Sequence, residues 1–161
     1  MNFKQGDIQD VTIIDLQKRE DNRGHLIELF RQDWLPEDSM PVMGYISLTH
    51  GGIIRGPHEH NDQTDMFCFI GPATFLVMLW DNRPYSPTYK NKISMSVGKN
   101  SPTLVVVPPG VVHGYQNISE EDGLVYNFLD QLFMGPNRSL PADEIRHESD
   151  PNSPFKWEIK W

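Results

Sequence analysis

Residues 52–71 read GIIRGPHEHNDQTDMFCFIG, and residues 108–117 read PPGVVHGYQN. The two segments place four side chains of metal-binding or acid–base character between glycine and proline turns: His58, His60, Asp65 and His113. Residues two apart in a strand point to the same side, so His58 and His60 are expected to face one way. The turns are expected to carry Asp65 onto the next strand and His113 onto a third, around one interior. Neutral imidazoles and a carboxylate together form a good ligand set for a divalent first-row metal.

The rest of the chain is cut into short pieces by 13 prolines and 12 glycines. Between the breaks lie runs rich in Val, Ile, Phe and Tyr, which are typical of strands. Many short strands with turn signals favour a β-sandwich, jelly roll or barrel over alternating βα units. The expected strands are Val11–Asp15, Leu26–Arg31, Tyr45–Leu48, Met66–Ile70, Ala73–Trp80, Ile93–Val97, Leu104–Val107 and Leu124–Leu129.

Two segments invite more specific expectations about packing. Ala73–Trp80 is apolar almost throughout, which fits a strand buried on both faces, as at a subunit interface. The last stretch, 151–161, carries Phe155, Trp157 and Trp161 and is expected to pack against the body of the protein.

Length and charge restrict the class of protein. A chain of 161 residues suits one domain, here 1–161. The net charge of −8 argues against nucleic acid as a partner, because phosphate backbones need clustered Lys and Arg. No apolar run approaches the roughly 20 residues of a membrane span, so no membrane is expected. The start MNFKQGDIQD lacks an apolar signal-peptide core, and a single cysteine, Cys68, excludes an intramolecular disulfide; both features favour the cytoplasm.

The two segments quoted first resemble the two halves of the cupin signature, G-x5-H-x-H-x4-acid-x5-G and P-x-G-x2-H-x3-N. The resemblance implies an all-β, single-domain cupin jelly roll (double-stranded β-helix). Further motifs resemble one family of cupins, the dTDP-4-dehydrorhamnose 3,5-epimerases, from about Asp21 to Trp157. They include Asp21-Asn22-Arg23-Gly24, Ile54-Arg55-Gly56-Pro57-His58, Ser86-Pro87-Thr88-Tyr89 and Glu144-Ile145-Arg146.

The resemblance implies an isomerase that removes a proton next to the ketone of a dTDP-4-keto-6-deoxyhexose in polysaccharide or deoxysugar biosynthesis. His58 matches the base of such enzymes, and Tyr126 matches the residue that returns a proton from the opposite face. Tyr126 also fits a core aromatic, since it lies in the apolar run Leu124–Leu129. Arg55 matches a cation near the sugar and its phosphates.

The resemblance also implies how the nucleotide is held. Arg23 and Glu28 match residues that bind it, in this family often from the neighbouring subunit, and His113 matches a further pocket residue. The implied partner is a nucleotide-linked sugar, the implied assembly is a homodimer, and no cofactor or metal is expected from the family.

Three departures from the family pattern concern the site itself. Asp65 stands where the family has a lysine that stabilises the enolate, which reverses the charge at that point. Glu59-His60 replaces an aromatic–glutamine step. The aspartate that the family sets behind its base has no counterpart in this sequence, and Asp65, Glu59 or Asp150 are the possible replacements.

Alternatives follow from these departures. In one, a divalent metal sits on His58, His60, Asp65 and His113, and the protein is a metal-dependent cupin enzyme of another class. In another, His60 is a second base or a substrate contact, as in the related sugar-nucleotide 3,4-ketoisomerases. In a third, the protein binds a sugar nucleotide without catalysis. The metal-free epimerase, with His60 and Asp65 as substrate contacts, is favoured on family grounds.

Overall fold

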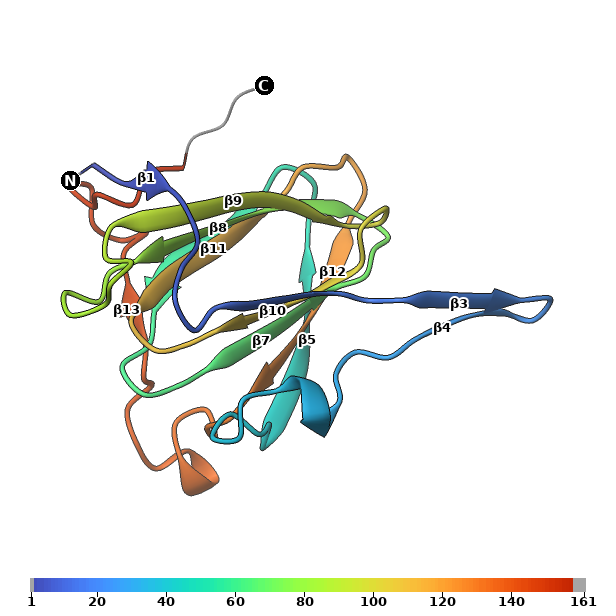
Figure 1. Cartoon of the computed structure of the whole chain (residues 1–161), viewed down its shortest axis with the longest axis horizontal. Coiled ribbons are helices and arrows are strands. Elements are labelled where there is room, and N and C mark those ends of the chain that lie inside the picture. Colours follow the sequence, from blue (N-terminus) through green and yellow to red (C-terminus); the bar gives the residue numbers. More distant parts are fainter. Residues whose placement is uncertain (1, 158–161) are drawn as a thin grey trace.

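Two β-sheets packed face to face make up the body of the protein in the computed structural model, which describes residues 2–157 (Figure 1). The first sheet has the order β1-β9-β8-β11-β6-β13 and the second β2-β10-β7-β12-β5. The first consists of β1 (Lys4–Gln5), β9 (Asn91–Gly98), β8 (Thr74–Asp81), β11 (Val111–Asn117), β6 (Ile54–Glu59) and β13 (Ile145–Arg146). The second consists of β2 (Thr12–Asp15), β10 (Thr103–Val107), β7 (Asp65–Phe69), β12 (Gly123–Leu129) and β5 (Met43–Thr49). The all-β jelly-roll expectation is confirmed.

The remaining elements are small. A separate hairpin is formed by β3 (Lys18–Asp21) and β4 (Gly24–Ile27). Two single turns of 3-10 helix, η1 (Gln32–Trp34) and η2 (Pro136–Arg138), lie in connections. No helix among the described residues is long and apolar enough to cross a membrane.

Aromatic and β-branched side chains fill the space between the sheets. Phe67 and Phe69 of β7 meet Phe75 of β8 and Tyr115 of β11 in one buried cluster, with ring centroids 5.4–6.1 Å apart. Such contacts between strands far apart in the chain hold the two sheets together. They occupy one part of the interior and leave the other part to polar side chains.

Strand β8 is buried on both faces, as its apolar run predicts, but its outer face is covered by the same chain. Phe155 and Trp157 pack against Trp80 with centroids 6.0 and 6.1 Å apart. The expected packing of the C-terminal stretch is thus confirmed for these two residues, and Trp161 lies outside the described residues. A subunit interface is not needed to explain the apolar character of β8.

The outer face of the second sheet is covered by the segment that follows the hairpin. Leu29, Phe30 and Leu35 pack there against Met66 and Leu104. This segment is mostly loop, so β4 is shorter than the predicted strand Leu26–Arg31 and begins two residues earlier.

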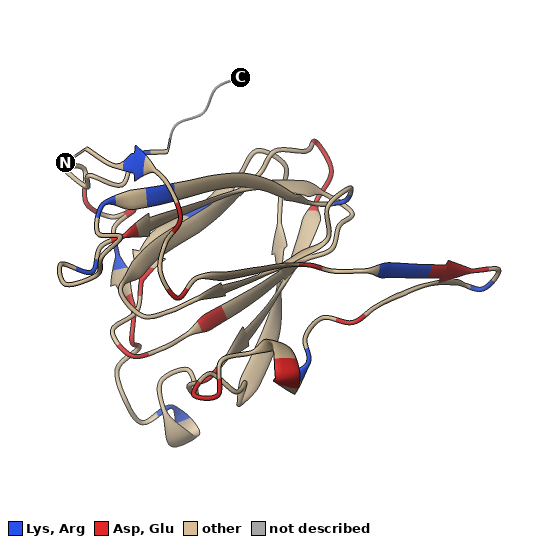
Figure 2. Cartoon of the chain, viewed as in Figure 1, with Lys and Arg blue, Asp and Glu red and all other residues tan. Residues whose placement is uncertain are grey.

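The β3–β4 hairpin projects from the body instead of packing on it (Figure 1). It carries charged residues of both signs (Figure 2), and an ion pair of 2.6 Å joins Arg23 to Asp21 near its tip. Leu26 on β4 is 59% exposed. The hairpin therefore has both polar and apolar groups without cover from its own chain.

Candidate active site

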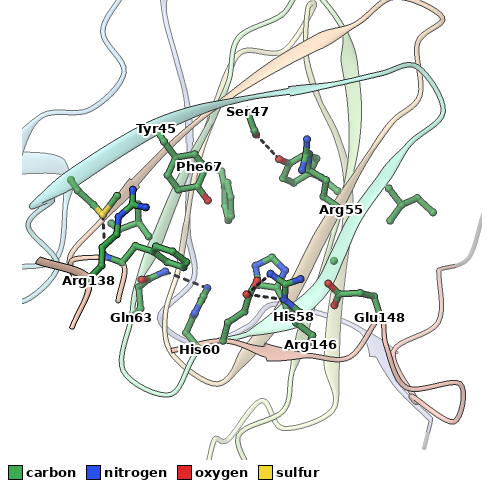
Figure 3. A pocket seen from close by; sticks show the side chains of 17 residues that line it. Tyr45, Ser47, Arg55, His58, His60, Gln63, Phe67, Arg138, Arg146 and Glu148 are labelled. Atoms are coloured by element: carbon green, nitrogen blue, oxygen red, sulfur yellow. Dashed lines mark hydrogen bonds and ion pairs between the residues drawn. The ribbon is translucent and has the colours of Figure 1, made fainter. Parts of the chain in front are cut away.

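A cavity of about 680 Å³ opens between the two sheets (Figure 3). Tyr45 and Ser47 of β5 line one side, and His58 and His60 lie at the opposite end with Arg146 nearby. Each of these side chains comes from a strand or from the connection next to one. Their positions are therefore held by the sheets.

A bulge in β6 determines which of its residues face the cavity. In the pairing with β11, His58 lies opposite His113 and Arg55 opposite Tyr115, so three steps on β6 match two on β11. Residues three apart in a regular strand point to opposite faces, whereas the bulge lets Arg55 and His58 both line the cavity. Gly56 makes this possible, with a φ of +82° and only 2.7 Å between the place of a Cβ and the backbone oxygen of His113.

Four side chains converge at the inner end of the cavity. One ligand atom each from His58, His60, Asp65 and His113 lies within 4.8 Å of all the others. They come from β6 and its end, from the start of β7 and from β11. The prediction that the two sequence motifs meet around one interior is confirmed in geometry.

Asp65 is the centre of this cluster. Its Oδ2 lies 3.0 Å from Nε2 of His60 and 3.0 Å from Nε2 of His113. Its Oδ1 accepts hydrogen bonds from the side-chain amides of Gln63 (2.9 Å) and Asn127 (3.2 Å). The carboxylate is 2% exposed, so its orientation is set by these neighbours.

Burial and mutual contact shift the pKa values of the cluster. Burial, together with the neighbouring His113, lowers the pKa of His58 to about 2, so this imidazole is neutral. Burial also lowers the pKa of His60, but contact with Asp65 outweighs it and the net shift is upward. Burial raises the pKa of Asp65, and the bonds to His113 and His60 more than reverse this, so the carboxyl is ionised.

None of the proposed replacements for the family aspartate orients His58. Asp65 contacts the other two histidines, and the Glu59 carboxylate bonds to Asn82 and His147. The Asp150 carboxylate accepts a backbone N–H within its own loop. No hydrogen bond recorded within residues 2–157 involves the ring of His58.

Residues 5–158 match the family of dTDP-4-dehydrorhamnose 3,5-epimerases. The chain belongs to this family. It is 36% identical over 128 residues to the probable low-salt glycan biosynthesis epimerase Agl13 of Haloferax volcanii, covering 78% of this chain and 81% of that protein. It is 29% identical over 157 residues to the spore coat polysaccharide biosynthesis protein SpsL of Bacillus subtilis, covering 96% and 99%.

Solved structures show the same fold. A dTDP sugar isomerase from Desulfovibrio desulfuricans superposes with a TM-score of 0.77 at 22% identity, covering 93% of this chain and 92% of that chain. NovW, a 4-keto-6-deoxy sugar epimerase from Streptomyces spheroides, gives a TM-score of 0.76 at 23% identity, covering 99% and 80%. The two packed sheets thus belong to a fold with solved representatives.

Arg55, expected near the sugar and its phosphates, does line the cavity. Its guanidinium donates to the hydroxyl of Thr49 (2.9 Å) and to the backbone oxygen of Leu48 (2.7 Å) on β5. Arg23 and Glu28 do not line the cavity of their own chain. Glu28 pairs with Arg19 at 3.2 Å, beside the hairpin.

The structure contradicts the expectation that Tyr126 faces His58 across the substrate. Along β12, Val125 and Asn127 point between the sheets, while Tyr126 packs on the outer face beside Met66 and Cys68. Neighbouring strand residues alternate faces, so Tyr126 cannot share the cavity with Asn127. The alternative interpretation, a core aromatic, is the one the packing supports.

Two tyrosines that sequence reasoning missed do line the cavity. Tyr45 accepts a hydrogen bond from Asn127 (2.9 Å), and burial raises its pKa to about 12. Tyr115 shares a hydrogen bond of 3.0 Å with Ser47. Tyr45 lay at the end of a predicted strand and Tyr115 inside the second motif, but neither position indicates a face by itself.

The acidic tail also contributes to the wall. Arg138, Glu144, Arg146 and Glu148 line the cavity, although the segment reads as a charged loop. Asp143 anchors it: its carboxylate accepts the backbone N–H groups of residues 61, 62 and 63. The Glu144-Ile145-Arg146 motif is the one signal in the sequence that points to this wall.

Proposed function

We propose that the protein is an epimerase of a nucleotide-linked 4-keto-6-deoxy sugar that serves glycan or polysaccharide assembly. The family match over residues 5–158 supports this reaction class. The names of Agl13 and SpsL, which concern glycan and spore coat polysaccharide synthesis, support the biological setting.

The observation that carries the proposal is the imidazole of His58, which faces a cavity that also contains guanidinium groups. Inversion next to a ketone needs a base on one face of the carbon and positive charge near the developing enolate. His58 would take the proton. Arg55 and Arg146, which line the same cavity, would hold the anionic parts of the substrate.

Tyr45 is proposed to return the proton in place of Tyr126. Its hydroxyl accepts from Asn127, which leaves its own hydrogen available to the cavity. A raised pKa of about 12 keeps the phenol protonated at neutral pH. In Figure 3 its ring lies across the cavity from His58.

Deuterium exchange tests the reaction directly. A panel of 4-keto-6-deoxy sugars linked to different nucleotides is incubated with the protein in heavy water, and NMR follows the protons on the carbons next to the ketone. Exchange is expected with at least one substrate, and His58→Asn is expected to slow it by about 10²–10⁴-fold.

Two tyrosine variants form a matched pair in the same assay. Tyr45→Phe is expected to reduce the net inversion, whereas Tyr126→Phe is expected to leave it near the wild-type rate. Tight binding without exchange across the whole panel would contradict the epimerase and indicate a binding protein. Equal losses in the two tyrosine variants would contradict the role of Tyr45.

A homodimer is proposed as the functional unit. The edge strand β5 exposes Ile46 and Leu48, at 57% and 48%, and the projecting hairpin presents Leu26 and Arg23 without cover. A second copy would cover these groups and bring Arg23 and Glu28 towards its neighbour's cavity. Light scattering is expected to show twice the chain mass, and Ile46→Lys is expected to shift it to the monomer.

The cytoplasm is the proposed compartment. Cys68 is the one cysteine of the chain and lies buried as a free thiol. Disulfides are typical of oxidising compartments, whereas thiols stay reduced in the cytosol, which is consistent with a free Cys68. Fractionation with an antibody against the chain is the corresponding measurement, and recovery outside the cytoplasm would contradict the proposal.

A further inference from the structure

In the histidine cluster, hydrogen-bond acceptors face one another without a donor between them. Nδ1 of His113 lies 3.0 Å from the backbone oxygen of Val111, and Nδ1 of His60 contacts the backbone oxygen of Asp143. A carbonyl oxygen only accepts, so both Nδ1 atoms must carry hydrogen. In a neutral imidazole the other nitrogen, Nε2, then has a lone pair and no hydrogen.

Both lone pairs point at the same anionic atom. Nε2 of His60 and Nε2 of His113 each lie 3.0 Å from Oδ2 of Asp65. The amide nitrogen of Gln63 lies 3.3 Å from Nε2 of His60 and only donates, which is consistent with Nε2 of His60 being an acceptor. Three acceptors therefore face one another in a buried place, an arrangement that is unfavourable without positive charge between them.

We propose that His60, Asp65 and His113 bind a divalent first-row transition metal ion. The site is one of two imidazoles and one carboxylate, a set that suits Zn²⁺, Fe²⁺ or Mn²⁺. Bonds of about 2.1 Å put neighbouring donors of an octahedral ion about 3.0 Å apart. The two separations between Nε2 and Oδ2, both 3.0 Å, are close to that value.

The surrounding contacts orient all three ligands. Backbone oxygens hold both imidazoles in the tautomer that presents Nε2, as is usual for metal-binding histidines. The amides of Gln63 and Asn127 occupy Oδ1 of Asp65 and leave Oδ2 for the ion. A metal site needs ligands whose orientation is fixed by neighbouring hydrogen bonds, and a chance group of polar residues lacks such contacts.

Protonation is the competing arrangement. A proton on His60 alone would make its Nε2 a donor to Asp65, but it would leave the lone pair of His113 against the same oxygen and turn the new hydrogen towards the amide of Gln63. Protonation of both histidines is the arrangement that satisfies Asp65 fully. It would turn Nε2 of each ring into a donor to Asp65, but it would place two imidazolium ions together in a buried place against one carboxylate. Like charges at such distances disfavour one another. The two arrangements differ in a measurable way, since the protonated cluster would not take up metal.

His58 stands beside this site and remains available as the base. Its ring centroid is 4.4 Å from that of His113, and its ring takes part in none of the recorded hydrogen bonds of residues 2–157. His58 and His60 line the cavity, so the open coordination positions would face the substrate. A bound ion would supply there the positive charge that the aspartate at position 65 removes from the family pattern.

Metal binding is measured without substrate, so its result is independent of the epimerase proposal. Protein purified without a histidine tag is stripped with a chelator and titrated with Co²⁺ under visible absorbance and with Zn²⁺ by calorimetry. One ion per chain is expected. Asp65→Asn and His113→Asn are expected to weaken it by at least about 100-fold.

Two further histidine variants serve as controls. His50→Asn removes an exposed ring that bonds to Asp122, outside the site, and is expected to bind the metal like wild type. His58→Asn is expected to keep the metal while losing deuterium exchange. Equal metal affinity in wild type and Asp65→Asn, or absence of saturable binding to wild type, would overturn the proposal.

Pulsed EPR of the Cu²⁺-loaded protein gives a readout that needs no variant to fold. Two coordinated imidazoles are expected from His60 and His113. Three would overturn the assignment of His58 as a free base, and none would overturn the site.

Discussion

Asp65 and Asp81 are both buried aspartates at strand ends, yet their surroundings differ in kind. Asp81 is fully buried and accepts hydrogen bonds from the guanidinium of Arg83 (2.9 and 3.0 Å) and from the hydroxyls of Ser86 and Thr88 (both 2.6 Å). Each of these groups is a true donor, and one carries a permanent positive charge. Asp65 has true donors on Oδ1 alone, while Oδ2 faces histidine nitrogens.

The contrast separates a structural carboxylate from a ligand. The Asp81 site is complete within the chain, and it ties the start of the 82–90 loop to the end of β8. The Asp65 site lacks such donors on Oδ2, and for this reason we propose a cation there. Burial alone therefore does not indicate function; the polarity of the partners does.

The largest expected effect is the loss of folding stability when the Asp81 site is disrupted. Asp81→Asn removes the buried carboxylate from Arg83, which keeps its contacts with Asp10 (3.3 Å) and with the backbone oxygen of Gln9 (2.7 Å). We therefore expect a loss of about 3 kcal/mol, the lower end of the range for a broken buried pair. Urea unfolding followed by fluorescence measures this loss. Ser86→Ala removes one hydroxyl only, and a loss as large as that of Asp81→Asn would contradict the central role of the ion pair.

The second largest effect is expected from metal addition, which should stabilise the protein through the Asp65 site and not through the Asp81 site. At a free concentration 100 times its dissociation constant, a ligand that binds only the folded state stabilises it by about 2.7 kcal/mol. Wild type and Asp81→Asn should both gain stability from Zn²⁺ in thermal unfolding, whereas Asp65→Asn should not. An equal gain in all three would show that the ion binds elsewhere.

The bulge at Gly56 is expected to matter for the histidine site and not for Asp81. An alanine there would strain the positive φ, at about 1–2 kcal/mol, and meet the His113 backbone oxygen. Chemical denaturation should show at least this loss, and metal affinity should fall as β6 shifts. Gly24→Ala is the control, because Gly24 also has a positive φ but nothing lies within 4 Å of an added Cβ.

Acid should weaken the Asp81 site over a defined range of pH. Burial raises the pKa of Asp81, but bonds from Arg83, Ser86 and Thr88 outweigh it and lower the pKa from 3.8 to about 2. A lowered folded-state pKa gives stability that is present above about pH 4 and is lost as the pH falls towards 2. The difference in unfolding free energy between wild type and Asp81→Asn should therefore shrink across that range, and a constant difference would contradict this.

The smallest expected effect is that of Asp65→Asn on the metal-free protein. An amide can keep its oxygen on Gln63 and Asn127 and donate from its nitrogen to one histidine lone pair. The unfolding free energy in the presence of chelator should stay within about 1 kcal/mol of wild type. A loss of several kcal/mol would show that His60 and His113 are both protonated and would remove the contrast with Asp81.

Much of the candidate site was predictable because three of its residues lie within a few positions of one another in the sequence. His58 and His60 are two apart, and the short polar turn Asn61-Asp62-Gln63-Thr64 leads directly to Asp65 on the next strand. The prediction for Tyr126 was wrong because the run Leu124–Leu129 has no clear alternation of apolar and polar residues. The sequence of this strand therefore does not indicate which of its faces points between the sheets. In the structure the polar Asn127 is the inward residue, bonded to Asp65 and Tyr45.

The wall made by Arg138, Glu144, Arg146 and Glu148 was hidden for a different reason. Exposed charged loops look alike in sequence, and what singles out this one is the anchoring of Asp143 on the backbone of residues 61–63. That contact joins segments about 80 positions apart. No local pattern encodes it.

The amino-acid sequence by itself determined the jelly-roll fold, the family and the four side chains that gather at the end of the cavity. It could do so because turn residues and strand periodicity act over a few positions. The tertiary structure alone decided which tyrosine faces the cavity and which atoms of His60, Asp65 and His113 oppose one another. Those facts depend on strand pairing and, for His60, on the backbone oxygen of Asp143 from a distant segment, and they carry the proposal of a cation site.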